Sequence, residues 1–269
     1  MNTRTGPVTG IVKAPLTLLY GLPLIWIVLT SFKPSSEVFG AAFSFTPTVA
    51  AYSDAMGPAL WTALRQSLTI AVGTTVLVLL FAVPAAYGLA HIKGWIASLG
   101  LGLLIVFQMA PQTANIIPLF QIFGSWRLLD TVVGVIVADT ALLIPFAVML
   151  LRPFFRAVPP ALEEAAQIDG ASMPRTFFSV VMPLARNGVF TVGTLVFLLA
   201  WGEFLYAVNF FLSPGTYPLS ALLSQQVSAF GINWPGLMAL AVLTSVPILI
   251  VYSLSYKSLR DGLAVGAVK

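Results

Sequence analysis

Few residues of this chain carry a charge. Of its 269 residues, 13 are Lys or Arg and 9 are Asp or Glu, which amounts to 8%, whereas a soluble globular domain carries about 25%. The hydrophobic share is 58% and the mean hydropathy is +0.96. A soluble enzyme of this composition could not cover its surface with polar groups, and a disordered chain needs low hydrophobicity. Both classes are excluded, and a polytopic membrane protein remains.

Residues that bind metals or act in catalysis are scarce. The chain has no cysteine and one histidine. These counts exclude a disulfide framework and a thiolate zinc site, and they leave little for catalysis based on histidine. We therefore expect no catalytic residue, no metal site and no cofactor in this chain.

Six apolar runs are long enough to cross a bilayer, whose hydrocarbon core of about 30 Å requires roughly 20 mostly apolar residues. Each run lies between charged residues, and the six cover about 14–32, 66–90, 96–118, 131–151, 189–209 and 236–256. The pattern predicts an all-α bundle of six transmembrane helices that forms a single domain over residues 1–269. Proline lies inside five of the runs, at Pro23, Pro84, Pro111, Pro145 and Pro247. Kinked helices in a packed bundle are the expected consequence.

The distribution of Lys and Arg predicts the orientation, because cytoplasmic loops carry an excess of both residues. With both termini in the cytoplasm, three bases lie outside: Lys33, Arg65 and Arg127. The other ten lie inside: Arg4, Lys13, Lys93, Arg152, Arg156, Arg175, Arg186, Lys257, Arg260 and Lys269. We therefore expect an N-in, C-in topology. No basic cluster alternates with aromatic residues, so nucleic acid is not an expected partner.

The cytoplasmic segment 152–188 has the pattern of two short helices. Pro159-Pro160 suits a helix start, and Glu163 and Glu164 fall in the first turn, where the helix dipole favours anions. Gly170 takes the C′ position, where a positive φ is usual. A second helix is expected from Ser172 until Pro183 stops it. One predicted face of the first helix holds Leu162, Ala165, Ala166 and Asp169, and the other holds Glu163, Glu164 and Gln167. An amphipathic loop on the lipid headgroups and a docking knob for a cytosolic partner both fit these residues.

This segment resembles the EAA loop of ABC importer permeases. The family pattern is E-A-A-x3-G-x9-I-x-L-P, and this chain matches it from Glu164 to Pro183, with Val180 for Ile and Met182 for Leu. The wider string LEEAAQIDGA, residues 162–171, is similar to the carbohydrate-uptake branch, in particular the smaller, MalG-like permease. Trp201-Gly202-Glu203-Phe204 and the tail 262–269 also resemble that branch, although the final glycine of the tail is missing.

The resemblance implies a non-catalytic permease subunit that forms half of a translocation pore for sugars or related polyols. Its implied partners are a second, larger permease, a dimeric ATP-binding subunit, an extracellular or periplasmic sugar-binding protein or lipoprotein, and the lipid bilayer. The implied location is the bacterial or archaeal cell (inner) membrane. The chain has no G-x-x-x-x-G-K-[ST] string for phosphate binding, so ATP and Mg are expected at the partner ATPase subunits.

Coupling to the ATPase is implied for the 159–183 loop. Glu164 would contact the rim of the ATPase cleft, Ala165 and Ala166 would pack closely in it, and Gly170 would form the bend. Glu163 would be a second charge contact or a solvated acid, and Asp169 would cap the bend or pair with Arg175 or Arg156. Pro183 would close the segment, and Gly262, Gly266 and Lys269 would carry the C-terminal tail between the ATPase subunits.

Two acids, Asp139 and Glu203, lie inside the predicted spans, where a charge is costly and a functional role is the default hypothesis. A sugar path could use them with Trp201, Tyr206 and Asn209, and with Gln108, Gln112 and Asn115 at the polar end of the third span. The alternative is polar packing between helices. A proton-coupled secondary transporter using Asp139 and Glu203 is the other functional reading, but it calls for repeated halves that this sequence does not show. His91 is expected at headgroup level, and the segment 213–217 as an external loop or a plain connector.

Overall fold

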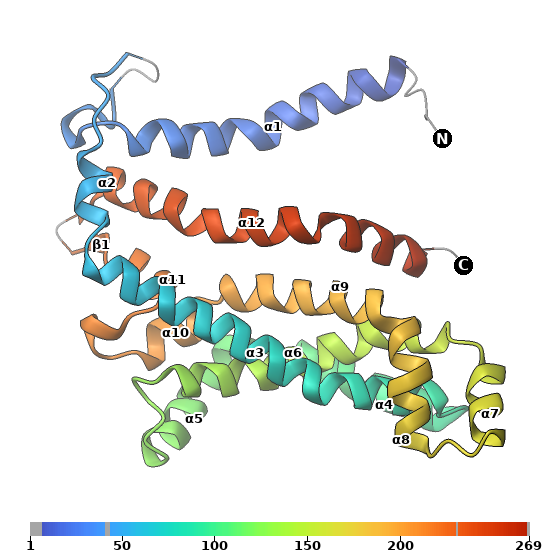
Figure 1. Ribbon diagram of the computed structural model, residues 1–269. Helices are drawn as coiled ribbons and strands as arrows, with labels where there is room; N and C mark the ends of the chain where they lie inside the picture. The colour runs from blue at the N-terminus through green and yellow to red at the C-terminus, as the bar shows by residue number, and fades with distance from the viewer. Residues whose placement is uncertain (1–6, 41–43, 230, 268–269) are drawn as a thin grey trace. The chain divides into compact units, whose positions relative to one another are not determined.

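The computed structural model describes residues 7–40, 44–229 and 231–267. In chain order the elements are α1 (Pro7–Ser31), the 3-10 helix η1 (Ser35–Glu37), α2 (Ala50–Ala55), α3 (Pro58–His91), α4 (Trp95–Met109), α5 (Gln112–Ser125), α6 (Val132–Arg156), α7 (Pro160–Ile168), α8 (Met173–Thr176), the π-helical segment η2 (Phe177–Val181), α9 (Met182–Trp201), α10 (Leu205–Phe210), the 3-10 helix η3 (Pro214–Thr216), α11 (Leu219–Ser224), β1 (Val227–Ser228), β2 (Gly231–Ile232) and α12 (Trp234–Ala267) (Figure 1). The two short strands pair antiparallel, with Val227 opposite Ile232.

The contacts of the chain divide it into two compact units. One unit comprises residues 1–61 and 222–246, and it holds α1, α2, the β-hairpin and the first part of α12. The other comprises residues 62–221 and 247–269, and it holds most of α3, all of α4 to α10 and the rest of α12. Every site described below lies within this second unit.

The expected helical membrane architecture is present, with fewer clear spans than six. Within the described residues, four helices are long and apolar enough to cross a membrane: Pro58–His91, Val132–Arg156, Met173–Trp201 and Trp234–Arg260. A fifth results if the bent pair α4 and α5 is one span, and Pro15–Ser31 is a shorter apolar helix. The all-α class is therefore confirmed, whereas the count of six spans and the N-in, C-in orientation stay predictions.

The third predicted span, 96–118, is not one straight helix. Its two halves, α4 and α5, meet at an angle of 83°. Ala110 is extended, with φ −62° and ψ 121°, and Pro111 follows with φ −66° and ψ 129°. The physical reason is that proline lacks an N–H and disfavours the α region for the residue before it. Pro111 therefore breaks the span instead of kinking it.

The fifth predicted span, 189–209, begins and ends elsewhere. The helix continues through Pro183, which lies in the first turn of α9, so the prediction that Pro183 ends the second cytoplasmic helix is wrong. The preceding π-helical segment carries the chain from α8 into α9 without an interruption. Its wider turn bonds the Met182 amide to the Phe177 carbonyl five residues back, and a local π-helical adjustment of this kind accommodates a proline that lacks an N–H. At the other end α9 stops at Trp201, and residues 202–204 separate it from α10.

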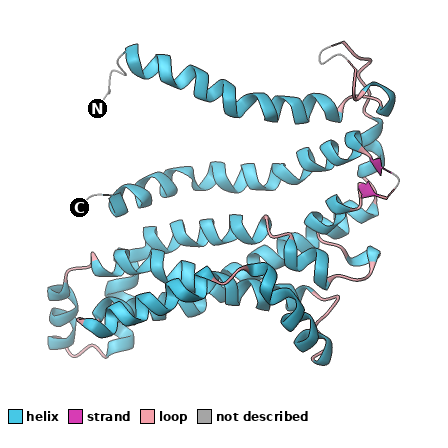
Figure 2. Cartoon of the chain, turned by 180° about the vertical axis from the view of Figure 1, so that it is seen from behind, coloured by secondary structure: helices cyan, strands magenta, loops and turns pink. Residues whose placement is uncertain are grey.

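The core of the second unit joins α3, α5, α6 and α10. The buried cluster consists of Ile70, Phe123, Val135, Ala138, Tyr206, Phe210 and Phe211. Nearby, α6 packs on both α4 and α9. Helices α6 and α9 approach closely at Gly188 of α9, which has no side chain. A Cβ added there would lie 2.3 Å from Cγ of Phe154 on α6, which is too close for two carbon atoms. Within this unit, α7 and α8 lie at one end, and α5 and α10 lie at the opposite end (Figures 1 and 2).

Candidate functional site

The predicted coupling segment folds as a short helix with a glycine-dependent end. Pro159 and Pro160 begin α7 as expected. After Asp169 at the C-cap, Gly170 adopts φ +83°. The Gly170 amide donates to the carbonyl of Gln167 at 3.0 Å, and the Ala171 amide donates to the carbonyl of Ala166 at 2.9 Å. These two bonds form a Schellman motif, which needs a left-handed residue at C′. The prediction for Gly170 is confirmed, and the motif sets the direction from α7 to α8.

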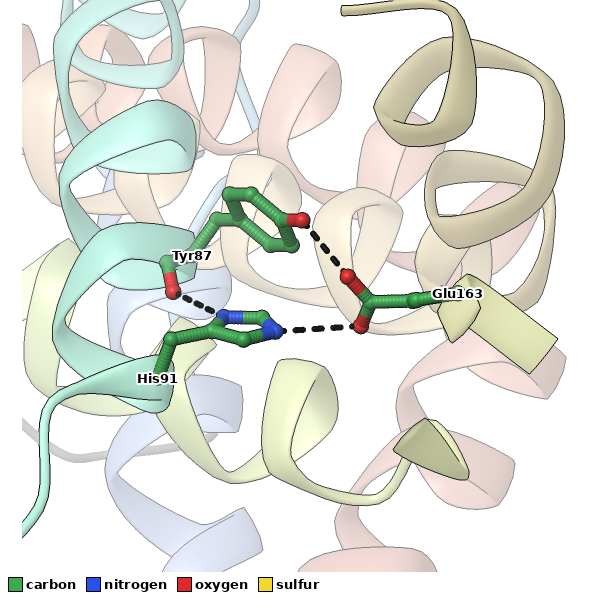
Figure 3. A network of polar contacts seen from close by, with 3 residues as sticks. All are labelled: Tyr87, His91 and Glu163. Carbon is green, nitrogen blue, oxygen red and sulfur yellow. Dashed lines mark hydrogen bonds and ion pairs between the residues drawn. The ribbon is translucent and has the colours of Figure 1, made fainter. Parts of the chain in front are cut away.

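Glu163 turns inward from α7 and binds α3. Its side chain is 7% exposed. The Tyr87 hydroxyl donates to its Oε2 at 2.6 Å, and His91 Nε2 lies 3.1 Å from its Oε1. Figure 3 shows the phenol and the imidazole both pointing at this one carboxylate. Because Tyr87 and His91 are four residues apart, they share one face of α3. Glu163 is therefore not a solvated acid, which was one of the two roles expected for it from the sequence.

The two predicted faces of α7 therefore need correction. Glu163 and Glu164 were expected on one polar face, but Glu163 is buried and Glu164 is exposed. Ala165 is exposed beside Glu164, whereas Ala166 is half-buried. Ile168, which the sequence analysis did not single out, is 86% exposed. The outer surface of α7 thus combines an acid, a small residue and a large apolar residue.

The remaining coupling residues are placed as follows. Asp169 caps α7 through its backbone and forms no ion pair with Arg175 or Arg156, all three being described residues. Pro183 lies in α9, beyond the π-helical segment. Gly262 and Gly266 lie in α12, but the structure does not describe the contacts around them. Lys269 lies outside the described residues, so its role in the tail stays a prediction.

A pocket of about 730 Å³ adjoins the Glu163 contact. It is lined from the end of α3 and the start of α4, from the end of α6 and from the start of α7. Its charged or titratable lining residues are His91, Lys93, Arg152, Arg156, Glu163 and Glu164. Nε of Arg152 donates to the Leu89 carbonyl at 3.1 Å, which satisfies one of the acceptors left open at the end of α3. The pocket lies where three helices meet α7.

The two acids that were predicted to lie inside spans, Asp139 and Glu203, come together at the opposite end of the unit. Asp139 lies in the candidate span Val132–Arg156, whereas Glu203 lies beyond the candidate span that ends at Trp201, so its predicted place inside the fifth span is wrong. Glu203 follows α9, and its carboxylate accepts hydrogen bonds from Nε2 of Gln112 at 2.8 Å and from the amides of Tyr206 at 2.8 Å and Ala207 at 3.1 Å. The break at residues 202–204 therefore positions an acid that caps α10. These bonds support the reading of Glu203 as polar packing between helices.

Asp139 is different, because it is fully buried and neither of its carboxyl oxygens has a hydrogen-bond partner among the described residues. It lines a cavity of about 310 Å³ together with Gln112 and Glu203. The other predicted path residues do not line this cavity. Gln108 is exposed, and Trp201 is buried. The Asn115 side chain hydrogen-bonds Tyr206, and the Asn209 side chain donates to the Leu205 carbonyl. Of the residues predicted for a sugar path, Gln112, Asp139 and Glu203 line this cavity, and the path itself stays a prediction.

The loop at 212–216 is held by an acid that sequence reasoning missed. Asp130 has φ +62°, and its carboxylate accepts hydrogen bonds from the amides of Leu212 and Ser213 and from the hydroxyls of Ser213 and Thr216. Burial raises the pKa of Asp130, but these hydrogen bonds outweigh it and leave the pKa below its usual range. No local pattern indicated a contact across more than 80 residues.

Comparison with known proteins is consistent with this geometry. The chain matches the model of the binding-protein-dependent transport system inner membrane component family over residues 79–265. It is 34% identical to the sulfoquinovosyl glycerol transport system permease protein SmoH of Agrobacterium fabrum over 263 residues, which are 96% of this chain and 92% of that protein. It is 32% identical to the trehalose transport system permease protein SugB of Mycobacterium tuberculosis over 260 residues, 94% of this chain and 95% of that protein.

The fold has a solved counterpart. A chain in the crystal structure of a bacterial ABC transporter involved in the import of the acidic polysaccharide alginate superposes with a TM-score of 0.75 at 23% identity, covering 96% of this chain and 98% of that chain. The EAA-like segment, the helical membrane fold and the family match over most of the chain agree. This chain therefore belongs to the family of inner membrane components of binding-protein-dependent transport systems, and it is a multi-pass permease subunit of an ABC importer.

Proposed function

We propose that this chain forms half of the pore of a sugar or polyol importer and that α7 docks into a separate ATPase subunit. The observation that carries the proposal is the outer surface of α7, where Glu164, Ala165 and Ile168 are exposed next to the bend at Gly170. The small side chain of Ala165 allows close approach, Ile168 offers an apolar contact, and Glu164 offers a charge at the rim.

The partners follow from this arrangement. A second, larger permease would complete the pore, and an extracellular or periplasmic sugar-binding protein or lipoprotein would deliver the ligand. ATP and Mg would bind the dimeric ATPase, since this chain has no phosphate-binding loop. Closure of that dimer would move α7, and rigid-body motion of the helices packed on it would open the pore.

The proposed ligand class is a sugar or related polyol. Named transport systems of the relatives act on sulfoquinovosyl glycerol and trehalose. In this chain the cavity lined by Gln112, Asp139 and Glu203 offers amide and carboxyl groups, which bind hydroxyl groups by hydrogen bonds. The unpartnered carboxyl of Asp139 is the group in that cavity with the greatest need of a donor.

Docking is tested by co-purification. The chain, its partner permease and the cognate ATPase are co-expressed, and the ATPase retained on the affinity-tagged chain is quantified. Glu164→Lys should reduce retention at least about fivefold, because it places a cation where an acid is proposed to contact the ATPase. Asp54→Lys, the same charge change at an exposed site on α2, is the matched control. Full retention by Glu164→Lys would refute docking through α7.

The ligand class is tested on the cognate binding protein. Calorimetric titration with a panel of monosaccharides, oligosaccharides, polyols and amino acids should show binding of a sugar or polyol. Binding of an amino acid with no response to any sugar or polyol would contradict the proposed class.

A further inference from the structure

We propose that Tyr87, His91 and Glu163 form a proton-dependent link through which α7 moves α3, so that cytoplasmic pH sets how well ATPase closure is transmitted to the pore. The proposal rests on the proposed function in one respect, namely that α7 docks on the ATPase. It goes beyond that function by assigning a transmission role to three residues inside this chain.

The first step concerns the connection between the two helices. Of the described side chains of α7, Glu163 is the one that hydrogen-bonds to another element, and both of its oxygens bind α3. The neighbouring Glu164 is exposed. Two bonds from one buried carboxylate resist both pulling and rotation, because they are separated along α3 by one turn. A displacement of α7 is therefore passed to the end of α3 through Glu163.

The second step concerns the phenol. The ring of Tyr87 packs on Phe155 of α6 and Phe177 of η2, with centroid distances of 5.9 and 4.8 Å. The hydroxyl is thus presented to Glu163 from a ring held on two further elements. Tyr87 is a positioning residue, since it fixes the carboxylate and would not touch ligand or nucleotide.

The third step concerns the proton. Nδ1 of His91 lies 2.9 Å from the carbonyl oxygen of Tyr87, and Nε2 lies 3.1 Å from the Glu163 carboxylate. Both neighbours are acceptors, whereas a neutral imidazole has only one N–H. The contact as drawn in Figure 3 therefore needs one proton shared between Nε2 and Oε1. When this proton leaves, the single N–H of the neutral ring can serve either Glu163 or the Tyr87 carbonyl, so one of the two contacts of His91 is lost.

The charged groups around His91 act on its protonation in opposite directions. The carboxylate of Glu163 and the C-terminal end of α3 favour the cationic ring. Glu164 on α7 lines the same pocket, as do Lys93 in the connection to α4 and Arg152 and Arg156 on α6. The three fixed cations oppose protonation of His91, and the two acids favour it. A rise in pH would weaken the link but not remove it, because Tyr87 still donates to Glu163.

The test uses the assembled transporter in lipid nanodiscs. The chain has no cysteine, so Ile92→Cys introduces a single labelling site in it. The Ile92 amide bonds the Gly88 carbonyl and therefore moves with α3. A bimane fluorophore at this position reports the motion of α3 when ATP, Mg and vanadate close the ATPase. We expect Glu163→Gln and Tyr87→Phe each to reduce the fluorescence change at least about threefold while the ATPase stays bound. Tyr252→Phe, at an exposed tyrosine on α12, is the matched control.

The pH arm separates transmission from a merely structural role. When it is measured between about pH 6 and about pH 8.5, the fluorescence change of the native chain should fall as the pH rises and a ring nitrogen loses its proton. In His91→Arg, which keeps a cation at all these pH values, the change should be independent of pH. The native pH dependence in His91→Arg, or an undiminished change in Glu163→Gln with the ATPase bound, would overturn the inference.

A second measurement does not depend on the ATPase. Because His91 is the one histidine of the chain, ¹⁵N-histidine labelling gives a single imidazole in NMR spectra of the purified chain. Glu163→Gln should move the Nε2 resonance more than the Nδ1 resonance, because Nε2 faces the Glu163 carboxylate. Equal resonances in both chains would refute the link itself. Failure of the native chain to retain the ATPase would instead refute docking.

Discussion

The close approach of α6 and α9 gives a prediction whose size follows from the structure. In Gly188→Ala the new methyl group would lie 2.3 Å from Cγ, 2.5 Å from Cδ1 and 2.8 Å from Cβ of Phe154. Rotation of the ring cannot relieve the contact with Cβ, so the two helices must separate. Overpacking of this kind costs about 1–3 kcal/mol, and the preference of a helix for alanine over glycine returns about 0.5–1 kcal/mol. We expect a net loss of about 1–2 kcal/mol.

The measurement is unfolding of the purified chain in mild detergent by titration with SDS, followed by circular dichroism. Gly102→Ala is the matched control, because Gly102 also lies within a helix but a Cβ there would meet no atom within 4 Å. That variant should be neutral or stabilised by up to about 1 kcal/mol. If Gly188→Ala is as stable as Gly102→Ala, the inferred contact between α6 and α9 is wrong.

Three further predictions concern the site. Gly170→Ala forces a side chain into φ +83°, which costs about 1–2 kcal/mol; it should fray the end of α7 and lower ATPase retention, and unchanged retention would argue against the bend. Gln112→Leu removes the donor 2.8 Å from Glu203 and should destabilise the chain by about 1–3 kcal/mol in the same SDS titration, where a neutral result would contradict this bond. Asp130 has a lowered pKa, so its stabilisation is present above the usual pKa range of Asp and is lost as the pH falls through the lowered value. Proteolysis at residues 212–216 should therefore rise in acid for the native chain and be fast at every pH in Asp130→Asn, and equal pH profiles would refute the clamp.

Local chemistry explains which features could be predicted. Composition alone indicated a membrane protein, and proline and glycine indicated where α7 begins and ends, because Pro160 and Gly170 act through the backbone of their immediate neighbours. The same local reasoning was less successful for Pro111 and Pro183. Both prolines lack an N–H, but one breaks a span and the other is carried into a helix. The difference lies in the neighbouring turns and not in the proline itself.

The sequence by itself determined the class of the protein, the family-like segment at 162–183 and the residue types available for coupling, since these depend on hydrophobicity, backbone conformation and spacing along one helix. Only the tertiary structure decided the roles of Glu163 and Glu164, two identical and adjacent side chains. A rotation of about 100° around α7, the step between adjacent residues, separates a buried carboxylate bound to Tyr87 and His91 from an exposed carboxylate available to a partner. The pairing joins residues more than 70 positions apart, and no local pattern encodes it, because it depends on which face of α7 packs against α3. The few charges of this chain are thus assigned to their tasks by packing.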